Sequence, residues 1–176
     1  QKLRVEEQLF ESGLPFTILQ PTAYMQNILA QWNQIIEGIY PVPYAPETRL
    51  SLVDLEDVAQ AAAIVLTEPG YIGATIELVG TPAMSQIEIA EALSEQLGRP
   101  VAVEVVPHEA WARRARASGL GENQVLTLIK MFRYYESYGF MGNSNALSCL
   151  LRRQPASFAD FVRRIASERE NDLRVS

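Results

Sequence analysis

The sequence predicts an α/β fold, in which a parallel sheet is covered by helices and followed by a mostly helical C-terminal region. Three observations predict it. Short β-branched runs alternate with segments of helical spacing, glycines and prolines separate most of these segments, and only helical spacing remains after Pro107. Such alternation is typical of parallel sheets with helical crossovers. The composition, 48% hydrophobic and 20% charged among 176 residues, is that of an ordinary globular protein.

Four short apolar runs are the predicted strands. They are residues 15–19, 50–53, 74–79 and 101–106. The first stops before Pro21 and the last stops at Pro107, because proline cannot donate a hydrogen bond to a strand ladder. Gly38 and the prolines at positions 41, 43 and 46 predict a loop before the second strand.

The helices are predicted from apolar residues at helical spacing and from their end signals. They cover residues 3–11, 24–36, 54–66, 85–97, 109–118, 122–137 and 157–169. Ser85 and Glu88 have the spacing of a capping box, and Gly98 is placed to end the helix that they begin. Asp54 and Asp57 stand at the start of another helix.

The predicted sheet is thin for so many helices, because a complete α/β domain usually has five or more strands. The first residues lack both an initiator Met and the apolar region of a signal peptide. We therefore expect a processed protein or a fragment, which forms the back half of something larger.

Charge and composition argue against several classes of function. The net charge is −6, which disfavours binding to nucleic acid. Residues 1–88 carry three basic and eleven acidic side chains, and the arginine pairs of the second half read as solvated helix faces. The longest aliphatic run, Ala61–Leu66, is too short to cross a bilayer. With one cysteine, the chain suits a reducing cytoplasm.

Isolated polar residues do not form a recognisable catalytic motif. Asp54 and Asp57 are explained by helix capping and the helix dipole rather than by a catalytic carboxylate pair. His108, the only histidine, follows Pro107 without a nucleophile motif, and we interpret it as structural. Cys149 is expected to be a small buried hydrophobe. We expect no metal site, and neither a Gly-x-Gly-x-x-Gly turn nor a Walker loop is present.

The strongest pattern begins at Lys2, which on residue chemistry alone is a surface cation. Lys2–Asn27 resembles the central block of the NmrA-like family, atypical relatives of the short-chain dehydrogenases/reductases. The matching features are the Lys, a Val-Glu pair, a Leu, a Ser-Gly pair, the Thr-x-Leu-x-Pro strand at 17–21, and an aromatic residue before Asn27. Later segments that fit the family are 51–59, 76–90, 97–101 and 152–158.

This resemblance implies the second half of a doubly wound parallel Rossmann-like sheet with an appended, mostly helical C-terminal region. Residues 1–80 would be the remainder of an NAD(P)-binding Rossmann domain, with a small-domain insertion near 38–53. Residues 81–176 would form a mainly helical region that binds substrate or a partner. The cofactor would be NADP or NAD, and its glycine-rich phosphate loop would lie outside this chain.

The resemblance also implies the site residues. Lys2 is the expected catalytic residue and would contact the ribose and nicotinamide of the cofactor. Tyr24, Met25, Gln26 and Asn27 would bind the nicotinamide end. Tyr24 and Asn27 would also border the substrate. This location agrees with the general rule that ligands sit beyond the carboxyl ends of parallel strands.

Two classes of function stay open at this point. The first is an NAD(P)H-dependent oxidoreductase acting on quinone-like or small carbonyl compounds. The second is a redox sensor or regulator that binds the dinucleotide without turnover and docks a protein partner, which its acidic front half would steer. Two departures keep the second open: a catalytic Tyr four residues before Lys2 would precede the chain, and Gln20 stands where many relatives have Arg. A scaffold without cofactor is a third alternative.

Overall fold

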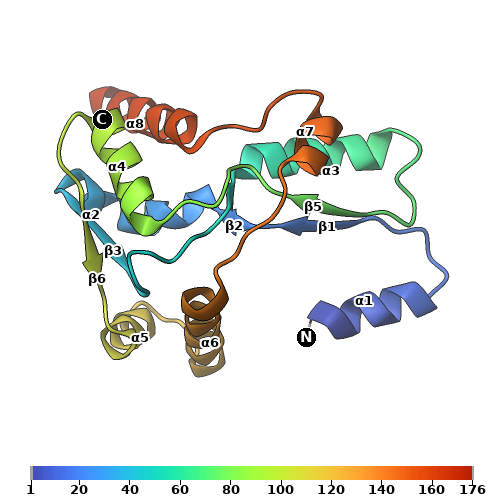
Figure 1. The fold of residues 1–176 in the computed structure, drawn as a ribbon, viewed down its shortest axis with the longest axis horizontal. Coiled ribbons are helices and arrows are strands. Elements are labelled where there is room, and N and C mark those ends of the chain that lie inside the picture. Colours follow the sequence, from blue (N-terminus) through green and yellow to red (C-terminus); the bar gives the residue numbers. More distant parts are fainter. Residues whose placement is uncertain (1, 176) are drawn as a thin grey trace.

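The strands of the chain associate in parallel pairs (Figure 1). The computed structural model describes residues 2–175, with the side chains of residues 4–169 and 171. The pairs are β1 (Ile18–Pro21) with β5 (Thr75–Leu78), β2 (Ala23–Tyr24) with β4 (Leu52–Val53), and β3 (Ile39–Val42) with β6 (Ala102–Val105). These parallel pairs confirm the predicted α/β class.

Helices connect and cover the strand pairs. They are α1 (Lys2–Glu11), η1 (Met25–Gln31), α2 (Trp32–Ile36), α3 (Leu55–Thr67), α4 (Gln86–Leu97), α5 (His108–Ala117), α6 (Glu122–Tyr138), α7 (Asn145–Leu151) and α8 (Phe158–Val175). In Figure 1, α3 and α7 lie together on one side of the β1–β5 pair and α1 lies on the other side. Helix α7 was not among the sequence expectations. The other helices are where the periodicity predicted them, although η1 is a 3₁₀ helix.

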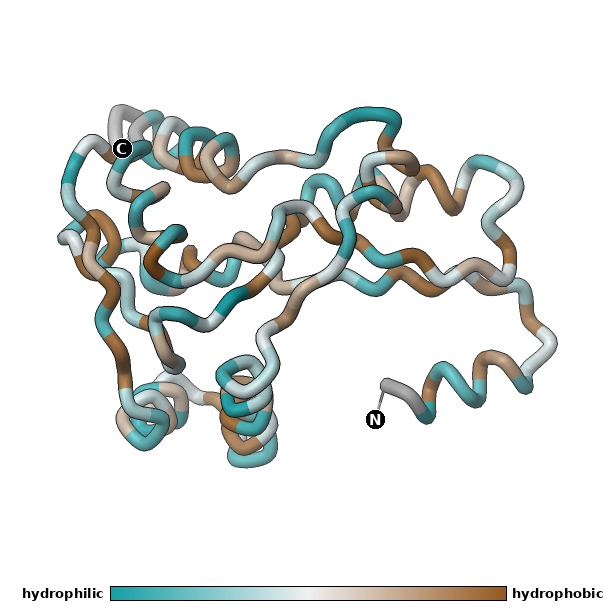
Figure 2. The backbone as a smooth tube through the Cα atoms, viewed as in Figure 1, coloured by the Kyte–Doolittle hydropathy of each residue, from teal (hydrophilic) through white to brown (hydrophobic). Residues whose placement is uncertain are grey.

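Two apolar clusters hold the strand pairs and the helices that cover them together, and a third joins α5 to α6. The larger cluster joins η1 and α2 to α4 and α8, with Met25, Leu93 and Phe161 among its fully buried members. The smaller cluster packs α3 and α7 onto the β1–β5 pair through residues such as Ala61 and Leu147. Hydrophobic segments accordingly run along the central strands in Figure 2. Burial of apolar area is the main favourable term in such packing.

Residues 39–42 form a strand, and the expectation of a loop there is wrong. Gly38 turns the chain with a φ of 95°, and Tyr40 and Val42 then bury their side chains. Pro41 is compatible with this strand because β3 pairs on one side only, and proline is tolerated in edge strands. Strand β3 pairs with β6, so part of the segment expected as an insertion, 38–53, packs with the second half of the chain.

Strand β1 is also displaced from the expected residues. It covers Ile18–Pro21 rather than 15–19, and Pro21 belongs to the ladder instead of ending it. Again a neighbour is present on one side only, because β1 pairs with β5 alone among the described strands. The strand therefore ends two residues later than the periodicity predicted.

Candidate functional site

The residues expected to line a ligand site follow the carboxyl ends of two adjacent strands. Tyr24 ends β2 and pairs in register with Val53, the last residue of β4. The next residue along each strand is therefore Met25 on one side and Asp54 on the other. Parallel strands bring such positions to one edge of the sheet, which is where α/β folds place their ligands.

The 3₁₀ geometry of η1 determines which of these side chains face outward. A 3₁₀ helix has three residues per turn, so side chains three apart lie above one another. Tyr24, Asn27 and Ala30 are all exposed, whereas Met25 and Ile28 are buried. Tyr24, the extended residue that ends β2, and Asn27 in η1 are the two residues expected to border a substrate, and both are exposed at this edge. We refer to this exposed pair as the outward face. Met25 lies fully buried in the apolar core, and its expected role in cofactor binding stays a prediction.

Gln26 points into the protein and is held by both ends of its amide. Its Nε2 donates to Oδ1 of Asp54 at 2.6 Å, and its Oε1 accepts from the backbone N–H of Leu55 at 3.2 Å. Both partners belong to the start of α3, so the amide fastens η1 to the end of β4. The expected role of Gln26 in cofactor binding stays a prediction, and the structure gives this side chain a second function.

Asp54 is fully buried and makes three hydrogen bonds. Its Oδ1 also accepts from the backbone N–H of Glu56, which confirms that it caps α3. Its Oδ2 accepts from Nη2 of Arg164 on α8 at 2.7 Å. Burial by itself would lower the pKa of Arg164, but the hydrogen bond and charge of Asp54, with the charge of Glu56, outweigh it and raise that pKa.

Asp57, one turn along α3, holds a different segment. It is also buried, and its carboxylate accepts from Nη2 of Arg153 at 2.6 Å and from the backbone N–H of Ala156 at 2.7 Å. The sequence expectation that both aspartates are structural rather than catalytic is in line with these contacts. Capping, however, explains only Asp54. The sequence predicts that Arg153 and Arg164 lie on solvated helix faces. Their ion pairs with Asp57 and Asp54 instead connect residues 153–164 to the start of α3.

Lys2 is the first residue of α1, and its side chain lies outside the described residues. Figure 1 shows α1 below the β1–β5 pair, joined to β1 by a loop at the right of the view. The described side chains of α1 are largely exposed, among them Val5 and Phe10 at 63% and 56%. The role of Lys2 as a catalytic and cofactor-binding residue therefore stays a prediction.

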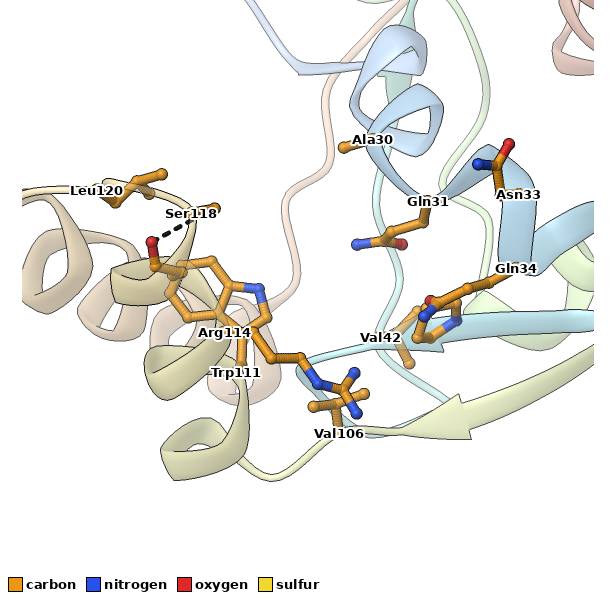
Figure 3. A pocket seen from close by; sticks show the side chains of 12 residues that line it. Ala30, Gln31, Asn33, Gln34, Val42, Val106, Trp111, Arg114, Ser118 and Leu120 are labelled. Atoms are coloured by element: carbon orange, nitrogen blue, oxygen red, sulfur yellow. Dashed lines mark hydrogen bonds between the residues drawn. The ribbon is translucent and has the colours of Figure 1, made fainter.

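A groove of ≈ 460 Å³ opens between η1, α2 and α5 (Figure 3). Ala30 and Gln31 line one wall, Trp111 and Arg114 line the other, and Val42 contributes from β3. Ala30 follows Asn27 by one 3₁₀ turn. The groove that it lines offers an indole ring, an amide and a guanidinium.

Other candidate residues have structural surroundings. Nε2 of His108 lies 2.6 Å from the carbonyl oxygen of Pro43, and its ring is near Phe132, in line with the structural interpretation. Cys149 is exposed, so the expectation of a buried hydrophobe is wrong. On α7 the apolar face is taken by Leu147, Leu150 and Leu151 instead. Among the described residues, no three His, Cys, Asp or Glu side chains gather as a metal site.

The described residues include no helix that is both long and apolar enough to cross a membrane.

The exposed face of Tyr24 and Asn27 offers a phenol hydroxyl and a carboxamide at the strand ends. A nicotinamide carboxamide needs hydrogen-bonding partners of this kind, so the residues present fit that end of a dinucleotide.

Comparison with known proteins gives a family match and several relatives. The sequence model of the NmrA-like family matches residues 1–162. An NAD(P)H azoreductase from Xenophilus azovorans is 28% identical over 159 residues, covering 90% of this chain and 55% of the relative. Quinone oxidoreductase 2 from Escherichia coli (strain K12) is 25% identical over 162 residues, covering 92% of this chain and 57% of the relative.

Solved structures of similar fold also include oxidoreductases in complex with NADPH or NADP(H). The NADPH-dependent quinone oxidoreductase from Escherichia coli, solved in complex with NADPH, superposes with a TM-score of 0.80 and 26% identity, covering 93% of this chain and 58% of that one. The Citrobacter triphenylmethane reductase in complex with NADP(H), 22% identical with a TM-score of 0.78 over 92% of this chain and 57% of that one, shares the fold. This chain thus spans little more than half the length of these proteins.

Proposed function

Because the chain belongs to the NmrA-like family, we propose that the full-length protein is an NAD(P)H-dependent oxidoreductase that reduces quinone-like or small carbonyl compounds. The observation that carries the proposal is the shared outward face of Tyr24 and Asn27 at the carboxyl ends of parallel strands. The relatives that are an azoreductase and a quinone oxidoreductase support this reaction class.

A nicotinamide dinucleotide would supply the hydride when bound, and the residues of this chain would bind and orient the reactants. Asn27 offers its amide to the nicotinamide carboxamide, and Tyr24 presents its hydroxyl and ring beside the bound substrate. Lys2, whose side chain lies outside the described residues, would hold the ribose and nicotinamide through its ammonium group. Its positive charge would also lower the pKa of a neighbouring hydroxyl acid, which would favour the donation of a proton to the reduced substrate.

The groove between η1 and α5 is the place we propose for the distal part of the substrate. Trp111 is half-buried on its wall, and its ring contacts Phe132 edge-on with centroids 4.8 Å apart, which fixes the indole. An aromatic substrate would gain apolar contact with this indole, and the amide of Gln31 lies on the opposite wall. A planar aromatic acceptor suits such a groove.

The test is turnover by the full-length protein with NADPH or NADH and a panel of quinones, azo compounds and small carbonyl compounds. We expect oxidation of the reduced nicotinamide to depend on one of these acceptors, and the ratio of kcat/KM for NADPH and NADH gives the cofactor preference. Tight binding of the dinucleotide with no oxidation by any acceptor would contradict an enzyme and favour the sensor.

A further inference from the structure

We propose that Arg164 and Asp54 are positioning residues, which hold Gln26 and thereby fix the turn that carries Tyr24 and Asn27. The inference rests on the proposed function for the meaning of the turn, and it adds residues that touch neither cofactor nor substrate. It also gives helix α8 a part in the site through Arg164, which lies 110 residues beyond Asp54 in the sequence.

The three side chains form one continuous chain of short contacts. Nη2 of Arg164 donates to Oδ2 of Asp54 at 2.7 Å, and Oδ1 of the same carboxylate accepts from Nε2 of Gln26 at 2.6 Å. The other end of the Gln26 amide accepts from the N–H of Leu55, so the side chain cannot rotate without losing both bonds. Charge-assisted contacts of this length are the strong class of hydrogen bonds.

Burial makes the arrangement depend on Arg164. Asp54 is fully buried, so its carboxylate needs a compensating charge within the fold. Arg164 is the only basic side chain among the described residues in ion-pair contact with it. The guanidinium also bonds Glu56 at 2.8 Å and lies over the ring of Phe161, so its own position is fixed.

The link reaches the site because Gln26 lies between the two exposed residues. Tyr24 precedes it by two positions and Asn27 follows it directly. Met25 and Ile28 anchor the same turn in the apolar core, which prevents outward displacement. The polar link adds to this apolar anchorage a direct hydrogen-bonded connection between η1 and the end of β4.

The chain contains a matched control for this claim. Arg153 and Asp57 repeat the arrangement one turn along α3: an arginine of the C-terminal segment pairs with a buried aspartate at 2.6 Å. Its further partner is Gln60 rather than a residue of η1. Loss of Arg153 therefore removes a comparable ion pair without a direct connection to the turn.

The experiment compares Arg164→Ala and Arg153→Ala in the full-length protein by hydrogen–deuterium exchange and steady-state kinetics. We expect amide exchange in residues 24–31 to rise in Arg164→Ala and to equal the wild type in Arg153→Ala. We expect the KM for the preferred dinucleotide to rise roughly tenfold in Arg164→Ala alone. The reason is that misplacement of the turn that carries Tyr24 and Asn27 weakens their contacts to the dinucleotide. Arg164→Lys, which keeps the charge, should recover part of the loss.

A merely structural role gives a different pattern. Destabilisation lowers the folded fraction, and hence the apparent kcat, and raises amide exchange in all elements alike, but it leaves KM unchanged and does not single out residues 24–31. Equal exchange of these residues in both variants would overturn the inference, whatever the activity. If the wild-type protein turns over no acceptor, the proposed function fails, and exchange in residues 24–31 still decides whether Arg164 positions the turn.

Discussion

At the residue scale, Asp54 and Asp57 have different structural roles although both stand at the start of the same helix. Their positions at a helix start predicted capping, and Asp54 does accept the N–H of Glu56. Asp57 instead binds Arg153 and the N–H of Ala156, 96 and 99 residues along the chain. No local pattern contains such partners, so this role could not be predicted from the sequence.

Replacement of Asp57 by alanine should lower the free energy of unfolding by roughly 1.5–3 kcal/mol, the scale of hydrogen bonds to a charged group. The reason is that the N–H of Ala156 loses its buried acceptor. Arg163→Ala, which breaks an exposed ion pair with Asp160, is the control and should cost at most about 1 kcal/mol. Urea unfolding measures both, and equal losses would contradict the account.

Lys2→Ala in the full-length protein should weaken dinucleotide binding or turnover by roughly 1–3 kcal/mol, the worth of a charge-assisted hydrogen bond. The reason is the loss of the ammonium group proposed to hold the ribose. Arg4→Ala, on the exposed surface of the same helix, serves as the control. A dissociation constant and a kcat that both match the wild type would remove Lys2 from the site.

At the element scale, helical spacing predicted the helices well and the strands less well. The capping box of Ser85 and Glu88 and the left-handed Gly98, with a φ of 63°, begin and end α4 as expected. Strand β3 was missed because Pro41 and the two prolines that follow the strand suggested a loop, whereas its pairing with β6 and the burial of Tyr40 and Val42 decide the outcome. The 3₁₀ form of η1 was missed because three- and four-residue spacings of apolar residues overlap in so short a segment.

The capping box supplies a pH-dependent prediction. The N–H of Ser85, with help from Arg49, lowers the pKa of Glu88 below its ordinary value of 4.5. A lowered pKa means that the contribution to stability is present above 4.5 and is lost as the pH falls through the folded-state value. Glu88→Gln should therefore lower Tm at neutral pH and have little effect in acid.

Thermal unfolding at neutral pH and well below 4.5 tests this, with Glu91→Gln on the exposed side of α4 as the control. The control should leave Tm nearly unchanged at both pH values. A difference between Glu88→Gln and wild type that is as large in acid as at neutral pH would show that the charge of Glu88 is not involved.

At the scale of the whole molecule, the sequence indicated the fold class but not how the pairs come together. Parallel pairing was expected from alternation, and the three separate pairs follow from contacts between distant segments such as β1 and β5. The resemblance at Lys2–Asn27 pointed to the segment that follows β2, where Tyr24 and Asn27 lie. The resemblance could not predict the groove, because its walls, η1 and α5, are far apart in the sequence and meet only in the folded chain.

The groove carries a prediction of its own. Trp111→Ala in the full-length protein should raise the KM for an aromatic acceptor several-fold and leave the KM for the dinucleotide unchanged, because it removes apolar surface from the groove alone. Trp111→Phe, which keeps a ring against Phe132, is the matched control for packing. Steady-state kinetics with each substrate varied in turn would show the difference, and an unchanged acceptor KM in Trp111→Ala would exclude the groove.

The most direct test of the account is the kinetics of Asn27→Ala beside Asn145→Ala, the same change at an exposed asparagine on α7. If the outward face of η1 borders the nicotinamide, Asn27→Ala should lower kcat/KM for the dinucleotide roughly tenfold, the kinetic equivalent of one hydrogen bond near the upper end of its usual range. Asn145→Ala should match the wild type. Wild-type kinetics in both variants would contradict the site, since the residue proposed to hold the nicotinamide would then be dispensable.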